Sequence, residues 1–391
     1  MRTPIYLDHA ATTPLDSEVF AAMIPWMRDE FANPSSIYAA ARTTKQALEG
    51  ARASVAKLLG ARVSEIVWTS GGTESINMAI QGVLRAHPKA HWVTTAIEHD
   101  AVLSCREPLL SDGHKVTTVA VSALGIVDPA EVESAITDET VMVSVMLANN
   151  EIGTIQPVKD IAKVIAKVRR SRSERGLKLP IYLHTDACQA AGYLDLSVDR
   201  LGIDLLTLNA SKIYGPKGSG LLYIRQGTQL DPLLYGGGQE RGRRSGTENV
   251  AAAVGLATAL AKAQFMRQEE TRRLAPLRDD LASRIVAAIP NALVNGGLKQ
   301  ALPGTLNLSL PGLEGQALVL YLDQVGIMAS TGSACSSPDL GPSHVLLALG
   351  RSNNDAAASL RLTLGRSTTA LDLDYVVLQL PAIVARLREI A

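Results

Sequence analysis

The sequence predicts an α/β fold with a mostly parallel sheet, because short β-rich apolar runs alternate with helical stretches through the first two thirds of the chain. One run, residues 141–147, is apolar almost throughout, as expected for a strand buried on both faces. A long helical pattern from residue 248 to about 289 is stopped by Pro290 and precedes a shorter, Gly/Pro-rich region. We therefore expect a large domain and a smaller α/β domain.

The individual elements follow in chain order. Helical segments are predicted to begin at Glu74 and at His99, each directly after a strand and a short turn. The long helix that ends before Pro290 is predicted to bridge the two domains. We expect residues 14–257 to form the large domain and residues 1–13 and 258–391 the small one. The predicted strands are residues 66–69, 92–95, 115–121, 140–148, 181–185, 204–208 and 220–224.

Composition limits the classes of function. The 391-residue chain carries 38 Lys and Arg side chains against 38 Asp and Glu, so no overall positive field attracts nucleic acid. Hydrophobic residues make up 47%, enough for a packed core, which excludes global disorder. No run approaches the roughly 18 apolar residues that cross a bilayer, and the first residues lack the apolar stretch of a signal peptide. We expect a cytoplasmic protein with no membrane partner.

The three cysteines are Cys105, Cys188 and Cys335. Their number is odd and their spacing wide, which fits neither a disulfide framework nor a zinc site, and we predict no metal. Cys335 lies among small polar residues rather than apolar ones, which favours an accessible, reactive thiol. Cys188 ends a predicted core strand and Cys105 falls in a helical segment, so we interpret both as structural.

One local feature is basic. Seven Lys and Arg side chains crowd residues 163–178, where acids are few. We favour a solvated helix and loop over a nucleic-acid site, so a link to nucleic acid stays possible but weak.

A glycine turn at residues 70–75 follows a predicted strand and opens a helix. Backbone N–H groups at a helix start favour an anion, and glycines such as Gly72 let a phosphate approach closely. Thr73 adds a hydroxyl donor. A plain tight turn explains the pattern equally well.

Two further residues lie at predicted strand ends, where ligands bind in open α/β sheets. Asp186 ends a buried strand, and its carboxylate suits either a cationic ring nitrogen or the cap of the next helix. Lys212 follows the next strand, where an amine beside a low-dielectric strand end can form a Schiff base. Lys217 in the same loop is interpreted as a surface lysine. With Cys335, these features suggest pyridoxal phosphate chemistry aimed at sulfur.

These residues, with others along the chain, match the motifs of a known family. The chain resembles the pyridoxal-phosphate-dependent cysteine desulfurases of the nitrogen-fixation and iron–sulfur-assembly type, in the group with a long mobile loop. This resemblance implies the class V aminotransferase fold of the pyridoxal-phosphate-dependent transferases. The matching motifs are residues 6–14, 33–36, 69–75, 98–99, 149–153, 156–157, 184–189, 211–218, 236–241, 244–249, 332–335 and 361–366.

The resemblance implies roles around the cofactor ring. Lys212 would form the Schiff base and move the proton at the substrate Cα. Asp186 would keep the pyridine nitrogen protonated, so that the ring accepts electrons. Gln189 would hydrogen-bond the ring oxygen, and His99 would stack on the ring face and handle protons.

It also implies the phosphate site. Thr73, Ser211 and the amides after Gly71, including that of Gly72, would hold the phosphate. A threonine at the position of Thr247 reaches the phosphate of the other subunit in this family, which implies a homodimer.

The substrate would be L-cysteine. Asn33, Asn150 and Arg361 match positions that bind its carboxylate, for which a bidentate guanidinium pair is the natural geometry. Cys335 would take the sulfur as a persulfide, alanine would leave, and the persulfide would pass to an acceptor, such as an iron–sulfur scaffold or a sulfur carrier. The small-residue loop around Cys335 would carry it from cofactor to acceptor.

The chain departs from the family pattern in two places. Where the family has Ser-x-His before the lysine, this chain has Asn209 and Ser211, both of which can still donate a hydrogen bond to phosphate. Tyr38 stands where the family has histidine.

Two alternative hypotheses remain. A selenocysteine lyase, or another pyridoxal-phosphate-dependent lyase or aminotransferase of the same fold, needs no loop thiol. A weakly catalytic partner protein would instead bind a scaffold or nucleic acid. The sequence does not select among iron–sulfur assembly, tRNA thiolation, DNA phosphorothioation and cofactor synthesis as the destination of the sulfur.

Overall fold

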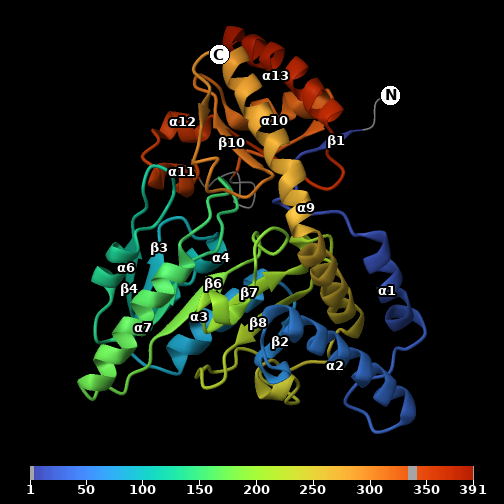
Figure 1. Cartoon of the computed structure of the whole chain (residues 1–391), viewed down its shortest axis with the longest axis vertical. Helices are drawn as coiled ribbons and strands as arrows, with labels where there is room; N and C mark the ends of the chain where they lie inside the picture. The colour runs from blue at the N-terminus through green and yellow to red at the C-terminus, as the bar shows by residue number, and fades with distance from the viewer. Residues whose placement is uncertain (1–3, 333–340, 391) are drawn as a thin grey trace.

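A large sheet forms the centre of the lower body in Figure 1, and within the described residues, 4–332 and 341–390 of this computed structural model, it has seven strands. Its order is β2-β8-β7-β6-β5-β3-β4. All neighbours from β7 to β4 are parallel, and β8 is antiparallel to both β2 and β7, so the predicted mostly parallel sheet is confirmed. The strands are β2 (Ile66–Thr69), β3 (His91–Thr95), β4 (Lys115–Val119), β5 (Thr140–Ser144), β6 (Tyr182–Asp186), β7 (Leu205–Asn209) and β8 (Gly220–Ile224).

Both faces of the large sheet are buried, which explains the continuous apolar runs. Along β8, Leu221 and Tyr223 pack into one hydrophobic cluster while Leu222 and Ile224 pack into another. Because successive side chains of a strand point to opposite faces, these two clusters lie on opposite sides of the sheet.

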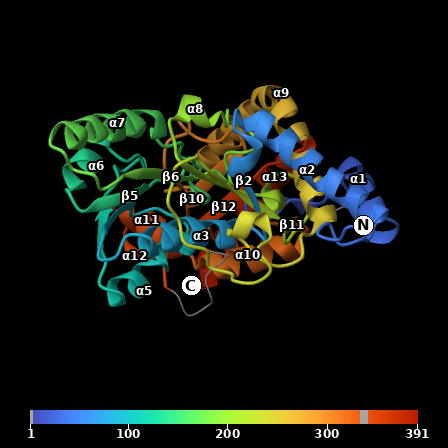
Figure 2. The ribbon, with the colours of Figure 1, turned by 90° about the horizontal axis from the view of Figure 1, so that it is seen from below.

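Helices cover the two faces, and Figure 2 shows α6, α7 and α8 on the side opposite α3 and α5. One cluster draws buried residues from α1, α2, α7 and α9, and the other from α3, α4 and α5. The helices that precede α9 are α1 (Ser17–Arg28), α2 (Ala39–Leu59), α3 (Gly72–Arg85), α4 (Asp100–Leu103), α5 (Arg106–Ser111), α6 (Pro129–Ala135), α7 (Val158–Glu174) and α8 (Val198–Leu201), with short 3-10 helices η1 (Val63–Glu65), η2 (Ala210–Lys212) and η3 (Glu240–Gly242).

The upper body in Figure 1 is built on a small antiparallel sheet of order β12-β10-β9 and on the parallel pair β1-β11. Ile5 and Leu7, from the start of the chain, pack into its core beside Leu306 and Leu362. Its elements are β1 (Ile5–Tyr6), β9 (Leu293–Val294), β10 (Thr305–Ser309), α10 (Gly315–Gln324), β11 (Ile327–Met328), α11 (His344–Ala348), α12 (Asn353–Ala357), β12 (Ser359–Thr363) and α13 (Ala370–Ile390).

One helix, α9 (Val250–Ala288), joins the two bodies and confirms the predicted long helix. Its 39 residues span about 58 Å at 1.5 Å per residue. Its first half packs into the core of the large sheet through residues such as Leu256, and its second half into the core of the small sheet through residues such as Leu281. The domain boundaries at 13/14 and 257/258 stay a prediction.

The predicted strand over residues 140–148 is too long, since β5 ends at Ser144. Beyond it, Val145 and Leu147 still donate backbone hydrogen bonds to the carbonyls of His184 and Asp186, at 3.0 and 2.8 Å. The chain therefore follows β6 in an extended course past the end of the ladder, which brings residue 150 to the strand ends.

The basic segment lies on α7 and the loop after it. Lys163, Lys167 and Arg175 make exposed ion pairs, as a solvated helix would. Arg172 differs from the expectation, because it is 3% exposed and donates to the carbonyls of residues 137, 140, 179 and 180. It holds the end of α7 against the start of β5 and the segment before β6. Among the described residues, no helix combines the length and apolar character needed to cross a membrane.

Candidate active site

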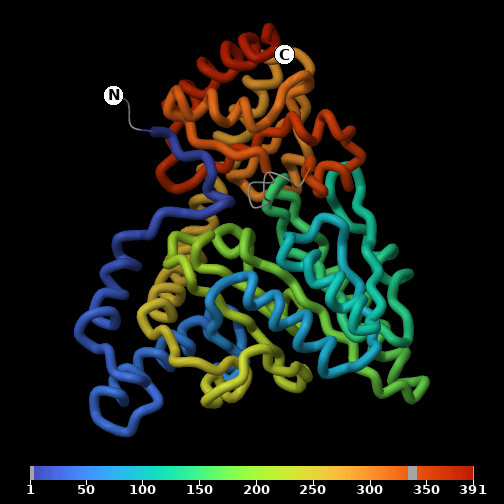
Figure 3. The backbone as a smooth tube through the Cα atoms, turned by 180° about the vertical axis from the view of Figure 1, so that it is seen from behind, coloured from blue at the N-terminus to red at the C-terminus, as the bar shows by residue number. Residues whose placement is uncertain are grey.

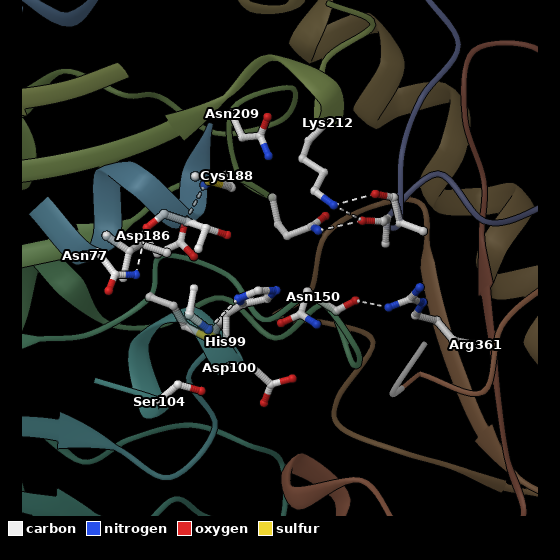
Figure 4. Close-up of a pocket in the computed structure, with 18 residues that line it drawn as sticks. Asn77, His99, Asp100, Ser104, Asn150, Asp186, Cys188, Asn209, Lys212 and Arg361 are labelled. Atoms are coloured by element: carbon white, nitrogen blue, oxygen red, sulfur yellow. Dashed lines mark hydrogen bonds between the residues drawn. The ribbon is translucent and has the colours of Figure 1, made fainter. Parts of the chain in front are cut away.

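A cavity of about 530 Å³ opens where the carboxyl ends of the large sheet's strands meet the start of α3, the N-terminal segment and β12 (Figure 4). Eight residues that the sequence predicted for the site line it, and they come from separate parts of the chain. They are Gly72, Thr73, His99, Asn150, Asp186, Gln189, Lys212 and Arg361.

Other predicted residues lie elsewhere. In the described structure, the cavity lining does not include Ser211, Thr247 or Asn33. Ser211 is buried and its hydroxyl donates to Asn209 Oδ1 at 3.0 Å. Thr247 is exposed and lines a second cavity of about 230 Å³, and Asn33 is exposed and accepts from a backbone N–H two residues on. Cys335 lies outside the described residues.

The start of α3 forms a close-fitting cradle. Gly71 has φ 154° and ψ −176°, a conformation that essentially only glycine adopts. A Cβ at Gly72 would lie 3.0 Å from Cys188 Sγ, and a Cβ at Gly220 would lie 2.6 Å from the Gly71 backbone. The packing around the turn thus excludes side chains and leaves the first backbone N–H groups of α3 as the surface for an anion.

Two hydrogen bonds to the Glu74 carboxylate hold this turn. Glu74 accepts from the Ser70 backbone N–H at 2.8 Å and from Arg244 Nε at 2.7 Å. The Arg244 contact connects the turn to the loop that carries Thr247. This pairing was not predicted, because 170 residues separate the partners along the chain.

Asp186 makes a cap-like hydrogen bond and also lines the cavity. Its Oδ1 accepts from the Cys188 backbone N–H at 2.9 Å, as a cap would, and its carboxylate lines the cavity while 7% exposed. Behind it, His184 contacts the Ser144 and Thr207 hydroxyls, and burial lowers the pKa of this histidine to about 4. A neutral His184 leaves the Asp186 charge to pair with a protonated ring nitrogen, which fits pyridoxal phosphate.

The two described cysteines are buried and unbridged, as expected if they are structural. Cys188 lines the cavity, yet burial and the nearby Asp186 raise the pKa of its thiol. Burial likewise raises the pKa of Cys105 to about 11. Both thiols stay protonated near neutral pH, so neither is a nucleophile.

Lys212 extends from η2 toward a segment we call the N-terminal strap, residues 5–13. Its Nζ donates to the carbonyls of Ala10 and Ala11 at 2.9 and 2.5 Å, and Gln189 Nε2 also donates to the Ala10 carbonyl. In Figure 4 dashed lines join the Lys212 amine to these two carbonyls. Lys217 is exposed, as predicted, and donates to the Thr13 carbonyl.

His99 caps α4, where its Nδ1 accepts from the Ala101 backbone N–H at 3.0 Å. The residue before it, Glu98, is fully buried, and its Oε1 accepts from the Thr95 hydroxyl and the Met146 backbone N–H. Burial, with a contribution from Asp186, raises the pKa of Glu98 to about 8. The sequence reasoning missed Glu98, since only the fold shows that this acid is enclosed.

Arg361 reaches the cavity from β12 and is 2% exposed. Its Nη1 donates to the Asn150 and Gly332 carbonyls at 3.1 and 3.2 Å, and its Nη2 donates to Asp8 Oδ1 at 2.8 Å. Among the described residues, Arg361 Nε has no partner. A buried guanidinium with an unpaired N–H at a cavity suits a carboxylate ligand.

Further lining residues were not predicted for the site. Asn209 lines the cavity in place of Ser211, and its position before the lysine, at a departure from the family pattern, was the signal available in the sequence. The cavity is also lined by Asn77, one helical turn after Thr73, and by Asp100 and Ser104 at the two ends of α4. Within residues 4–332 and 341–390, no group of three or more His, Cys, Asp and Glu side chains is placed to hold a metal ion.

Comparison with known proteins agrees with this geometry. The aminotransferase class-V family model matches residues 5–376. The chain is 45% identical to the cysteine desulfurase IscS of Clostridium botulinum, over all of this chain and 97% of the relative. It is 47% identical to the cysteine desulfurase IscS of Methanosarcina thermophila, over 99% of this chain and 93% of the relative.

A solved NifS-like protein superposes with a TM-score of 0.90 at 35% identity, covering 98% of this chain and all of that one. The predicted fold class is therefore confirmed. The chain belongs to the aminotransferase class-V family and, within it, to the cysteine desulfurases, whose cofactor is pyridoxal phosphate.

Proposed function

We propose that this chain converts L-cysteine to L-alanine and carries the released sulfur as a persulfide on Cys335. The observation that supports it best is the meeting of Asp186, Lys212 and Arg361 around one cavity, although these residues lie on three different elements. A pyridoxal phosphate enzyme that acts on an amino acid requires three groups: an acid for the ring nitrogen of the cofactor, an amine for the Schiff base, and a cation for the substrate carboxylate.

In this proposal, different cavity residues bind the substrate, bind the cofactor and transfer protons. Arg361 binds the substrate carboxylate, and Lys212 removes the proton from the substrate Cα. Asp186 holds a proton on the pyridine nitrogen, while Thr73 and the N–H groups at the start of α3 bind the phosphate. Pyridoxal phosphate, when bound, supplies the electron sink that stabilises charge at Cα.

The sulfur step belongs to Cys335. Its thiolate attacks the substrate sulfur, so a sulfur–sulfur bond forms and the bond from Cβ to sulfur breaks. The electron pair stays on Cβ, which takes a proton and completes alanine. The enzyme thiol is oxidised to a persulfide while Cβ is reduced, and an acceptor thiol then takes the outer sulfur.

The functional unit we propose is a homodimer. Thr247 is exposed and lies outside the active-site cavity of its own chain. Large apolar side chains are also exposed, including Ile37 at 91% and Tyr235 at 78%. A second copy that covers them would account for both features, with the partner's Thr247 completing the phosphate site.

The proposal is tested by mass spectrometry of cofactor-loaded protein after L-cysteine is added without reductant. We expect one additional sulfur on the Cys335 peptide and none in Cys335→Ala, which keeps the cofactor's absorbance but loses sulfur transfer. Cys105→Ala is the matched control, because Cys105 is buried and does not line the cavity, so this change should leave the persulfide unchanged. Turnover that survives in Cys335→Ala would instead indicate a lyase that needs no thiol.

A further inference from the structure

Asp8 contacts the carboxylate-binding arginine without lining the cavity itself, within the part of the chain that is described. The pair of Asp8 and Arg361 is 2.8 Å long, and the two side chains are 20% and 3% exposed. The partners lie 353 residues apart and meet because the N-terminal strap runs beside β12, with a bridge between Asp8 and Thr363. Figure 3 shows this first segment beside the orange and red chain of the upper body.

The surroundings of Arg361 show what Asp8 contributes. Three acceptors from three segments hold the guanidinium: the Asn150 and Gly332 carbonyls bind Nη1, and Asp8 binds Nη2. Without Asp8, the two carbonyls would hold one end only, and the planar group could turn about Nη1. The Nε, which has no partner among the described residues, would then lose its fixed direction.

We propose that Asp8 is a positioning residue that fixes Arg361 for the substrate carboxylate. This inference rests on the proposed function, because it takes Arg361 as the carboxylate ligand. Asp8 acts through Arg361 and does not touch the substrate.

Two effects of Asp8 oppose each other. Its negative charge weakens the attraction of Arg361 for an anionic carboxylate, whereas its hydrogen bond holds the guanidinium in place. Asp8→Asn separates them, because asparagine keeps the acceptor oxygen and removes the charge. Asp8→Ala removes both, and Asp8→Glu keeps the charge but moves the acceptor by one methylene.

The experiment measures equilibrium binding of L-alanine and of ethylamine, which lacks the carboxylate, by calorimetry on the cofactor-loaded protein. In Asp8→Ala we expect roughly tenfold to hundredfold weaker binding of L-alanine, the usual range for a charge-assisted hydrogen bond, with ethylamine unchanged. Asp8→Asn should stay within about threefold of the parent protein, and Asp8→Glu should lose affinity for L-alanine only. The last two variants decide the question if Asp8→Ala does not fold.

A double-mutant cycle tests whether Asp8 affects L-alanine binding through Arg361. In an Arg361→Lys background, which itself weakens L-alanine binding, Asp8→Ala should cause no further loss. The matched control is Asp374→Ala, which removes another 2.8 Å Asp–Arg pair that is exposed and whose two residues do not line the cavity. It should leave both affinities unchanged.

Three results would overturn the inference: equal weakening of both ligands in Asp8→Ala, an unchanged L-alanine affinity, or Asp8→Asn as damaging as Asp8→Ala. If Arg361→Lys leaves L-alanine binding unchanged, the carboxylate assignment fails together with the inference. The persulfide on Cys335 is measured separately, so failure here is distinguishable from failure of the proposed function.

Discussion

At the scale of single residues, the site depends on a position where a side chain is excluded. Gly72 opens α3 against Cys188 and Asn209, and a Cβ there would lie 3.0 Å from Cys188 Sγ. Packing, and not a left-handed backbone, therefore favours glycine at this position. In the proposed function, the cofactor phosphate binds the backbone N–H groups at this helix start.

We predict that Gly72→Ala lowers the affinity for pyridoxal phosphate by about tenfold or more, comparable to losing one hydrogen bond to a charged group. Absorbance titration of apoprotein with the cofactor measures it. Gly50→Ala is the control, because a Cβ there meets no described atom within 4 Å, and alanine in mid-helix stabilises by about 0.5–1 kcal/mol. An unchanged affinity of Gly72→Ala for pyridoxal phosphate would contradict phosphate binding at the start of α3.

Glu98 provides a second prediction, on pH. Its folded pKa of about 8 lies above the ordinary 4.5, so the folded chain keeps a proton that the unfolded chain loses. The contribution of this group to stability is complete below about pH 4.5 and falls as the pH rises to 8, by at most about 1.4 kcal/mol per pH unit.

Glu98→Gln should remove that slope, because glutamine keeps the acceptor oxygen for the Thr95 hydroxyl and the Met146 N–H and does not titrate. Urea unfolding at pH 5, 6, 7 and 8 measures the difference between the two proteins. Parallel curves would mean that Glu98 is ionised in the folded chain.

At the scale of elements, a buried ion pair holds the loop that leads to Thr247. Arg52 on α2 makes two 2.7 Å contacts with Glu240 on η3, and both side chains are 3% exposed or less. Glu240 also accepts from the Trp68 backbone N–H on β2. The Arg52–Glu240 pair thus connects a helix, a strand and a loop.

We predict that Arg52→Met destabilises the protein by about 3–5 kcal/mol, because it leaves Glu240 buried without a counter-charge. Replacing both partners, as Arg52→Met with Glu240→Leu, should restore much of that loss. Denaturant unfolding gives both values, and Arg28→Met, in an exposed pair with Asp29, is the control with no measurable change. Equal stability of the single and double variants would contradict this account.

The sequence predicted those parts of the molecule that depend on local pattern or on topology. Strands such as β6 were found because both sheet faces are buried, and Asp186 because ligands bind at strand ends. The pairs Asp8–Arg361 and Arg52–Glu240 were not found, since 353 and 188 residues separate the partners. With 38 charges of each sign, spacing alone does not identify such partners.

At the scale of the whole molecule, the proposed dimer makes two sites from shared parts. Each site would combine Lys212 of one subunit with the partner's Thr247. Mixing inactive Lys212→Ala with Thr247→Val, a variant weakened in cofactor binding, therefore regenerates one intact site in each mixed dimer.

We predict that the mixture recovers activity above the sum of its components, measured as alanine formed from L-cysteine. The control mixes the doubly substituted chain with the parent chain, which leaves no intact site in the mixed dimer. If instead the first mixture shows no recovery and the second keeps the full activity of its parent chains, Thr247 acts in the site of its own subunit.

The N-terminal strap also has a consequence for synthesis on the ribosome. Its carbonyls accept hydrogen bonds from Lys212, and its strand β1 pairs with β11 at Ile327–Met328, so the strap is made long before the residues that it contacts. At roughly 5–20 residues per second, that delay is of the order of tens of seconds. During this interval the nascent chain presents an unpaired apolar beginning, Ile5 and Leu7 included, to chaperones and proteases.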